Sequence, residues 1–244
     1  MKTNNKIIGS HLYLVDEIDS TNSELLENPD KYEHGSILCA KKQSSGRGRH
    51  KREWKSEKGG LYFSVLLKNL ENIHNIFPFV LLSALAVTRS ISFCLTHGLA
   101  IKWPNDIYIN HRKLCGILAE SSSRGNKHHL VIGLGINVNN AVAHLEDLRH
   151  PAVSLKECRG EEVDILHLLH KIANEMNDLY KDFLAGNFKE HLHELNRLLY
   201  AKGQEVEIQT PAGLRLITPL EFTPEAKLLC LENGTETELF MGEF

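Results

Sequence analysis

Between Ile101 and Gly135 the chain repeats one pattern, in which short strand-like segments are separated by polar turns. The segments cover 106–109, 113–120 and 129–135, and the turns cover 110–112 and 121–127. Strands that follow one another through short connections pair side by side and antiparallel. The segment 106–109 alternates and is short, which favours an edge position. The pattern predicts a mixed, largely antiparallel β-sheet.

Helical patterns accompany this sheet. From Asp164 to Ala185 apolar residues recur at helical spacing, and Gly186 stands where the pattern ends. Further helices are expected at 76–97 and 188–199, and further strands at 36–40 and 61–67. The chain is therefore expected to have an α+β fold in which the sheet is packed with helices.

The pattern changes after Lys202-Gly203. Short apolar segments at 206–208, 214–217, 228–231 and 239–241 are punctuated by proline and glycine. This spacing is typical of a small all-β unit. We expect two domains, a larger one at 1–200 and a β domain at 201–244.

Composition excludes several classes of protein. The chain has 244 residues, a net charge of −3 at pH 7 and five scattered cysteines. A dedicated nucleic-acid binder is usually basic, and an odd number of unclustered cysteines favours reduced thiols. The longest apolar run, 76–87, is too short to span a bilayer, and the N-terminal residues lack a signal-peptide core. We expect a cytoplasmic protein without nucleic-acid or membrane partners.

The stretch 43–58 is glycine-rich and basic. Gly46 and Gly48 let the main chain approach a ligand closely, and Arg47 and Arg49 carry fork-shaped donors that suit carboxylate and phosphate groups. The stretch predicts a mobile loop that closes over an anionic small molecule. Taken alone, it fits a solvated basic loop or a nucleic-acid patch equally well.

Residues 102–106 read Lys-Trp-Pro-Asn-Asp. Lys102 lies in an apolar strand pattern, where a partly buried ammonium needs a partner, and an anionic substrate would provide one. Asn105 and Asp106 then present an amide and a carboxylate after the Pro104 turn. A simple turn behind a lysine that reaches to solvent explains the same residues.

Two further stretches could contact a ligand. Ser20, Thr21 and Asn22 lie at a strand-to-helix junction, where they could cap the helix or bind a ligand. The segment 133–139 begins like a dinucleotide fingerprint but lacks its third glycine, so Asn137 could contact some other ligand. The fourteen histidines show no metal-site spacing, and metal ligands stay unknown.

With Lys113-Leu-Cys-Gly116-Ile-Leu, these separated motifs resemble the biotin protein ligases in order and rough spacing over nearly the whole chain. The resemblance implies a catalytic domain with a mixed sheet and helices, plus a small C-terminal SH3-like β-barrel. It also implies an activity: biotin and ATP, with Mg²⁺, give biotinyl-5′-AMP, and biotin is then transferred to a lysine of a carboxylase's biotin carboxyl carrier domain.

The resemblance also assigns roles to residues. The catalytic residues would be Lys102 and Arg49. The biotin and loop contacts would come from Ser20, Thr21, Asn22, Gln43, Gly46, Arg47, Gly48, Arg49, Lys102 and Gly116. The nucleotide side would include Trp54, Asn105, Asp106, Lys113 and Asn137.

Only nineteen residues precede Ser20, so the N-terminal helix-turn-helix of the bifunctional members, and with it a repressor role, is expected to be absent. The C-terminal domain departs from the family's glycine-rich turns, although Gly242-Glu243 keeps a familiar ending. A lipoate-type ligase of the same fold, or a non-enzymatic biotin- or nucleotide-sensing protein, remains an alternative. Either a monomer or a homodimer fits.

Overall fold

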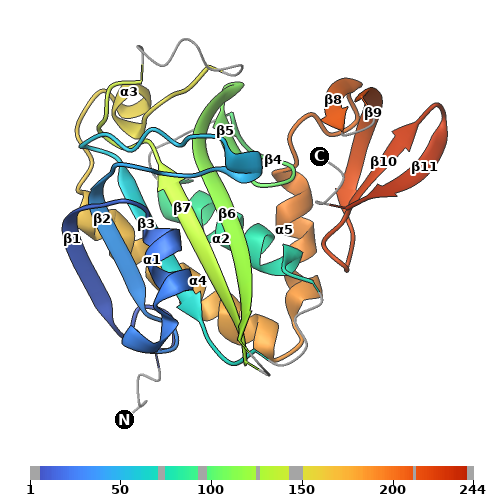
Figure 1. Ribbon diagram of the computed structural model, residues 1–244. Coiled ribbons are helices and arrows are strands. Elements are labelled where there is room, and N and C mark those ends of the chain that lie inside the picture. The colour runs from blue at the N-terminus through green and yellow to red at the C-terminus, as the bar shows by residue number, and fades with distance from the viewer. Residues whose placement is uncertain are drawn as a thin grey trace.

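The computed structural model describes residues 6–70, 75–92, 98–124, 127–142, 151–210 and 213–240. A seven-stranded sheet lies at the centre of its larger part (Figure 1). The strands are β1 (Leu12–Ile18), β2 (Ile37–Gln43), β3 (Leu61–Leu67), β4 (Leu99–Lys102), β5 (Asp106–Ile109), β6 (Arg112–Arg124) and β7 (Lys127–Ile136). Their spatial order is β1-β2-β3-β7-β6-β5-β4. Because β1 and β2 pair parallel and the other neighbours pair antiparallel, the expected mixed, largely antiparallel sheet is confirmed.

Two expectations about these strands are wrong. β5 is not an edge strand, since β4 pairs with it along its whole length and takes the outer position. The turn expected at 121–127 is instead mostly strand, because β6 and β7 stay paired as far as Arg124 and Lys127. Backbone hydrogen bonding does not depend on side-chain polarity, so an exposed polar segment continues the ladder. Residues 125–126 lie outside the described ranges.

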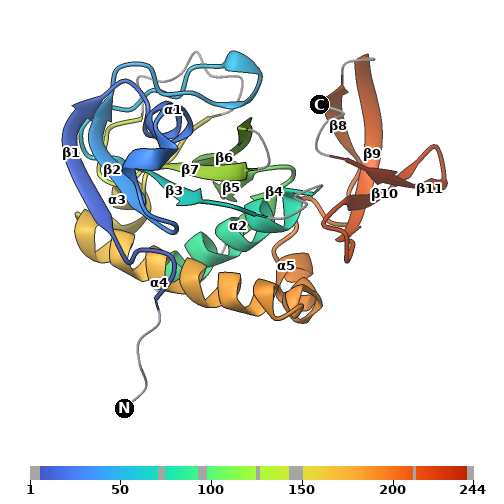
Figure 2. The same ribbon diagram turned by 60° about the horizontal axis from the view of Figure 1, so that its bottom comes forward.

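Helices cover both faces of the sheet (Figure 2). On one face lie α2 (Phe77–Ile91), α4 (Ile165–Leu184) and α5 (Leu192–Arg197), and on the other lies α1 (Thr21–Glu27). α2 is buried on nearly every side because it lies between the sheet and α4. The helix expected at 76–97 is confirmed as far as Ile91, and residues 93–97 lie outside the description. Short segments complete this part: η1 (Pro29–Lys31), η2 (Arg49–Lys51), α3 (Leu155–Arg159) and η4 (Phe188–His191). The helix expected at 188–199 is therefore a 3₁₀ turn, η4, followed directly by α5.

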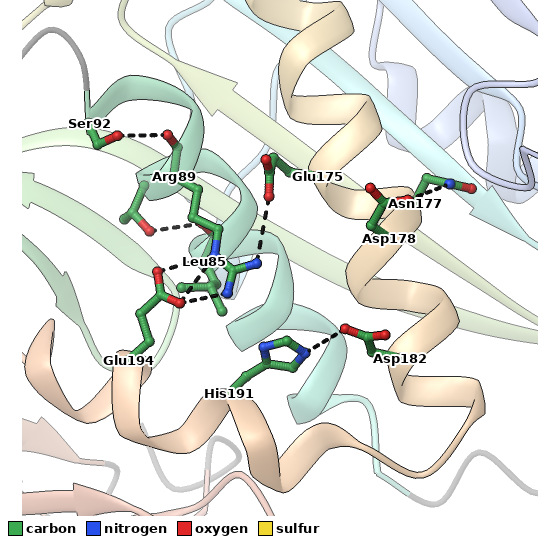
Figure 3. Close-up of polar contacts among 10 residues, drawn as sticks. Leu85, Arg89, Ser92, Glu175, Asn177, Asp178, Asp182, His191 and Glu194 are labelled. Carbon is green, nitrogen blue, oxygen red and sulfur yellow. Dashed lines mark hydrogen bonds and ion pairs between the residues drawn. The ribbon is translucent and has the colours of Figure 1, made fainter.

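One arginine ties the helix layer together (Figure 3). Arg89 of α2 donates to both carboxylate oxygens of Glu194 on α5, with its Nη2 2.6 Å from Oε2. Its Nη1 lies 3.6 Å from Glu175 Oε2 on α4. Nearby, His191 Nε2 lies 3.0 Å from Asp182 Oδ2 (Figure 3). These pairs hold the three helices that support the sheet from behind.

A second, four-stranded antiparallel sheet follows α5, with the order β11-β10-β9-β8 (Figure 1). Its strands are β8 (Val206–Thr210), β9 (Gly213–Phe222), β10 (Leu228–Glu232) and β11 (Thr235–Leu239). The expected fold class, an α+β part followed by a small β unit, is therefore confirmed. The strand expected at 239–241 is misplaced: Asn233 and Gly234, both at positive φ, form a tight turn that starts β11 at Thr235.

The two sheets share one hydrophobic core. Ile217 and Phe222 of β9 belong to the same buried cluster as the apolar side chains of α2 and α4. Asn196 of α5 joins the two parts further, since its Oδ1 accepts from the Phe222 amide at 2.6 Å. The predicted boundary at 200/201 lies between α5 and β8, and separate domains stay a prediction. No helix in the described ranges combines the length and apolar character needed to cross a membrane.

Candidate functional site

Three glycines lie near one another on the face of the sheet that α1 covers. Gly116 of β6 pairs with Gly135 of β7, and Leu118 pairs with Gly133. A Cβ at Gly135 would lie 2.5 Å from the indole of Trp54, and one at Gly133 would lie 2.1 Å from the Asn22 Oδ1 atom. The missing side chains leave space above the sheet, here called the trough, and the side chains of Asn22 and Trp54 fill part of it.

A polar network holds the start of α1 over this trough. Ser20 caps the helix by accepting from Ser23 N. The Thr21 amide donates to Gln43 Oε1 at 2.8 Å, and Thr21 Oγ1 lies 2.7 Å from Ser64 Oγ. Ser64 in turn donates to Asn22 Oδ1 at 2.6 Å. The cap of α1 and the hydrogen bonds of Thr21 and Asn22 thus occur at the same place. The four expected residues (Ser20, Thr21, Asn22 and Gln43) lie in one cluster.

Asn22 has little hydrogen-bonding capacity left. Its Nδ2 donates to Leu118 O at 3.1 Å and to Glu120 Oε2 at 2.9 Å, which uses both amide hydrogens. Its Oδ1 accepts from Ser64 and keeps one lone pair. The side chain is therefore fixed as an acceptor for a ligand N–H.

The glycine-rich loop is folded back on itself as an irregular hairpin. Trp54 N donates to Gly46 O at 2.9 Å, and Gly48 N donates to Arg52 O at 2.7 Å. Gly46 must be glycine here, since a Cβ would lie 2.4 Å from Trp54 O. At the tip, His50 has a left-handed backbone conformation. The predicted mobility of the empty loop stays a prediction.

The loop rests on β6 and β7 at two places. Arg47 Nη2 lies 3.1 Å from Glu120 Oε2 on β6. The Trp54 indole lies over Gly116 and Gly135, with Lys113 Nζ 5.4 Å from its ring centre. The indole Nε1 is buried and has no acceptor among the described residues. The loop thereby covers the trough where a ligand would have to lie.

Positive charge gathers around one carboxylate beside the trough. Lys113 Nζ lies 2.7 Å from Asp106 Oδ2, while Asp106 Oδ1 is buried without a partner in the described part of the chain. Burial lowers the pKa of Lys102, which Asp106 opposes and Lys113 reinforces. Burial likewise lowers the pKa of the half-buried Arg49, again opposed by Asp106, although a guanidinium stays protonated. Among the described residues, Asp106 is a carboxylate near all three cations, and this region attracts anions.

Two tyrosines hold the Lys102 ammonium. Lys102 Nζ lies 3.5 Å from Tyr108 Oη and 4.9 Å from that ring's centre. It also lies 5.7 Å from the ring centre of Tyr200, which stands between α5 and β8. Tyr200 is anchored to the strand that carries Lys102, since its amide donates to Ile101 O at 2.9 Å. The ammonium is thus supported by aromatic faces within cation–π range.

The two expected asparagines are engaged with backbone. Asn105 Nδ2 donates to Ile117 O at 2.6 Å and thereby holds the approach to β5 against β6. Asn137 is buried, and its Oδ1 accepts from Asn140 Nδ2 at 3.1 Å. Their contacts position strands and loops, and their nucleotide-binding role stays a prediction.

Sequence reasoning missed Ser64, Glu120, Tyr108 and Tyr200. A hydroxyl in the apolar run of β3 was a usable signal for Ser64, because a buried polar group needs partners. Tyr200 and Glu120 are brought to the site only by tertiary contacts. In the described ranges, no group of three His, Cys, Asp or Glu residues could hold a metal, and Asp106 is already paired with Lys113. The described residues therefore include no cluster of three such ligands for Mg²⁺.

The chain is similar to several known proteins. Residues 14–137 match the family model of the biotin/lipoate A/B protein ligase family. The bifunctional ligase/repressor BirA of Bacillus subtilis is 33% identical over 189 residues, 75% of this chain and 58% of that protein. The biotin--[acetyl-CoA-carboxylase] ligase of Paracoccus denitrificans is 31% identical over 160 residues, 64% of this chain and 67% of that protein.

A solved structure agrees over almost the full length. The biotin protein ligase from Aquifex aeolicus in complex with biotin and ATP has a TM-score of 0.84 and 30% sequence identity, covering 96% of this chain and 97% of that one. The chain spans only 58% of the length of the curated Bacillus relatives that it matches.

Proposed function

This chain belongs to the biotin/lipoate A/B protein ligase family, and we propose that it activates biotin with ATP and transfers it to a lysine of a biotin carboxyl carrier domain. The observation that carries the proposal is the arrangement of the trough. A fixed amide and hydroxyl network stands at one side, and Lys102, Arg49 and Lys113 share one carboxylate at the other. A ligand with a polar head and an anionic tail fits both sides.

In the first step a carboxylate oxygen of biotin attacks the α-phosphorus of ATP. The new oxygen–phosphorus bond gives biotinyl-5′-AMP, and pyrophosphate leaves with the electrons of the broken bond. Both reactants are anions, so their repulsion opposes the attack. Lys102 and Arg49 offset it, and they do so most strongly when the loop excludes water. No protein nucleophile is required.

In the second step the amine of a carrier lysine attacks the acyl carbon, and AMP leaves. The adenylate is a reactive mixed anhydride that water would also cleave. The loop rests on the trough through Arg47 and Trp54, so it can shield the intermediate until the lysine arrives. Shielding and charge neutralisation are thereby combined in the stretch 43–58.

Biotin recognition would use the α1 network. The ureido group of biotin presents N–H donors, and the remaining lone pair of Asn22 Oδ1 is an acceptor for one of them. Ser20, Thr21 and Gln43 surround the same place. Gly116 would let the ligand approach the sheet closely.

The nucleotide would lie nearer to Lys113 and Asp106. Trp54 presents a flat apolar face suited to adenine, and Lys113 and Asp106 lie beside it. Asn105 and Asn137 would support this side by fixing the strands. Mg²⁺ would be bound mainly through ATP phosphates, because it keeps few protein ligands in many nucleotide sites.

The acceptor would be the carrier domain of a carboxylase such as acetyl-CoA carboxylase, which the Paracoccus relative's name specifies for that protein. The proposal includes a catalytic domain at 1–200, a β domain at 201–244, a cytoplasmic location, a monomer or homodimer, and no nucleic-acid partner.

Mass spectrometry of the purified protein with biotin and ATP tests the activity. Biotinyl-5′-AMP and released pyrophosphate are expected. Lipoate in place of biotin is the matched arm, since the family includes lipoate ligases. An adenylate formed only from lipoate would reassign the substrate, and biotin binding without pyrophosphate release would indicate a sensing protein.

A further inference from the structure

Glu120 joins two parts of the site that are far apart in the sequence. It lies on β6, two positions beyond Leu118, and its register with Val131 places it on the same face of the sheet as the three glycines. Its Oε2 accepts from Asn22 Nδ2 at 2.9 Å and from Arg47 Nη2 at 3.1 Å. One oxygen therefore contacts both the helix that holds the polar network and the loop that covers the trough.

The loop side of this contact is an ion pair. The Arg47 side chain is 41% exposed and that of Glu120 is 28% exposed, so the pair is partly screened by water. Arg47 belongs to the hairpin, where it pairs with Glu53 in a backbone bridge. Holding Arg47 therefore holds the hairpin, while Trp54 provides the second contact with the sheet.

The helix side is a directional hydrogen bond. Glu120 is an acceptor and accepts from Asn22 Nδ2, so the amide keeps its nitrogen toward β6 and its oxygen toward Ser64. Without this acceptor, the orientation would depend on Leu118 O and Ser64 alone. The Asn22 amide could then rotate, and the free lone pair of its Oδ1 would no longer be held in one direction toward a ligand.

We propose that Glu120 is a positioning residue that couples biotin recognition by Asn22 to closure of the 43–58 loop through Arg47. The inference rests on the proposed function. A ligand that fixes Asn22 also fixes Glu120, and Glu120 in turn holds the loop arginine. Glu120 itself touches no reacting atom.

Two substitutions separate its two contacts. Glu120→Gln keeps a neutral oxygen acceptor for Asn22 but removes the negative charge that pairs with Arg47, whereas Glu120→Leu removes both contacts. Glu238→Gln is the matched control, since it removes the carboxylate of the Lys227–Glu238 pair (2.6 Å) in the second sheet. Melting temperatures of all variants verify folding.

Loop opening is measured by endoproteinase Lys-C cleavage after Lys51, without ligand and with biotin plus ATP. Both Glu120 variants should be cut about 2- to 5-fold faster without ligand, the range for an exposed ion pair. In an Arg47→Gln background, Glu120→Gln should add nothing further. The control should be cut at the wild-type rate.

Biotin recognition is measured as the KM for biotin in adenylate formation and by calorimetry. Glu120→Gln should raise the KM for biotin less than Glu120→Leu does, because it keeps an acceptor for Asn22. Glu120→Leu should raise KM about 5- to 10-fold, the scale of one lost hydrogen bond, with a smaller change in kcat.

Wild-type cleavage rates in both variants, or equal KM values for the Gln and Leu variants, would overturn the inference. The ligand-free cleavage arm needs no activity, so it still decides the loop contact if the wild-type protein forms no adenylate. That last result would contradict the proposed function instead.

Discussion

Two clusters of charged side chains in this protein are built in opposite ways. In the helix layer, Arg89 is matched by Glu194 and Glu175, and the hydrogen bond from Arg89 lowers the pKa of Glu194 (Figure 3). At the site, burial lowers the pKa values of Lys102 and Arg49. Folding therefore stabilises the charged form of Glu194 in the first cluster, whereas it destabilises the charged forms of Lys102 and Arg49 in the second.

Under the proposed function, the difference separates charges with a structural role from charges that bind the substrates. A cation with its own carboxylates has no capacity left for a ligand, whereas a desolvated cation with shared partners binds an incoming anion strongly. In the described structure, no carboxylate lies within 4 Å of Lys102 Nζ. The folded protein tolerates the unfavourable burial of the Lys102 charge because its stability is the sum of all interactions in the domain, those of the helix layer included.

The largest expected effect comes from Lys102→Met. Removing the ammonium should lower adenylate formation at least about 100-fold, the scale for one lost electrostatic stabiliser. The folded protein should be as stable as the wild type or more stable, because a desolvated charge is replaced by an apolar chain of similar length. Pyrophosphate release and thermal unfolding measure the two effects.

Lys102→Arg is the control that keeps the charge. Near-normal pyrophosphate release from folded Lys102→Met would show that the site does not depend on this cation. A marked loss of stability in the same variant would place Lys102 with Arg89, as a structural charge.

Arg49→Gly should give the next largest effect. The loop would lose a charge-assisted contact with the adenylate, and retention of the intermediate should fall about 10-fold or more. Released adenylate would then label lysines of a bystander protein, which streptavidin blotting detects. Stability should change little, since a half-buried loop arginine contributes little to the core. Unchanged retention would reduce Arg49 to surface charge.

Arg89→Met tests the other cluster. Breaking a fully buried ion pair costs about 3–5 kcal/mol, but the Arg89 side chain is 31% exposed, so about 1–2 kcal/mol is expected. The melting temperature should fall by about 2–4 °C for each kcal/mol. Adenylate formation per folded molecule should stay at the wild-type level, and Arg89→Lys should recover part of the stability.

The same pair has an acid dependence. The pKa of Glu194 is lower in the folded state than its ordinary value, so its contribution is complete above the unfolded pKa and is lost as pH falls through the folded one. The stability difference between wild type and Arg89→Met should therefore shrink in acid. A difference that is constant from pH 7 to pH 3 would contradict this account.

Local sequence patterns predicted the elements whose residues are buried and apolar. β3 and β5 have the predicted bounds, Leu61–Leu67 and Asp106–Ile109. The sequence misplaced β11 because its residues, Thr-Glu-Thr-Glu-Leu, are polar and are held in place by pairing with β10 across the Asn233-Gly234 turn. Strand formation there depends on a neighbour rather than on the segment itself.

The site divides in the same way. Lys102 and the 43–58 loop could be found because each lies in a contiguous motif. Glu120 could not, since its partners Asn22 and Arg47 are 98 and 73 residues away in the sequence. Tyr200 likewise reaches Lys102 only because it follows a segment paired with β4. Contacts through space require the fold, which the motifs alone do not give.

The smallest expected effect is a difference in alkaline stability, and it tests the comparison directly. The pKa of Lys102 is lower in the folded protein than in the unfolded chain, so the unfolded chain binds more protons between the two values. The penalty for the buried charge is complete below the folded pKa and disappears as pH rises past the unfolded value. Lys102→Met has no such penalty at any pH.

The stability advantage of Lys102→Met over the wild type should therefore be largest near neutral pH and should narrow as pH rises toward the ordinary lysine pKa of about 10.4. Taking the difference between the two proteins cancels the groups that titrate in alkali away from Lys102, because both proteins carry them in the same surroundings. Urea unfolding at a series of pH values measures it. An advantage that widens with pH would mean that the folded protein favours the charged lysine. Lys102 would then be a matched structural cation like Arg89, and the contrast between the two clusters would fail.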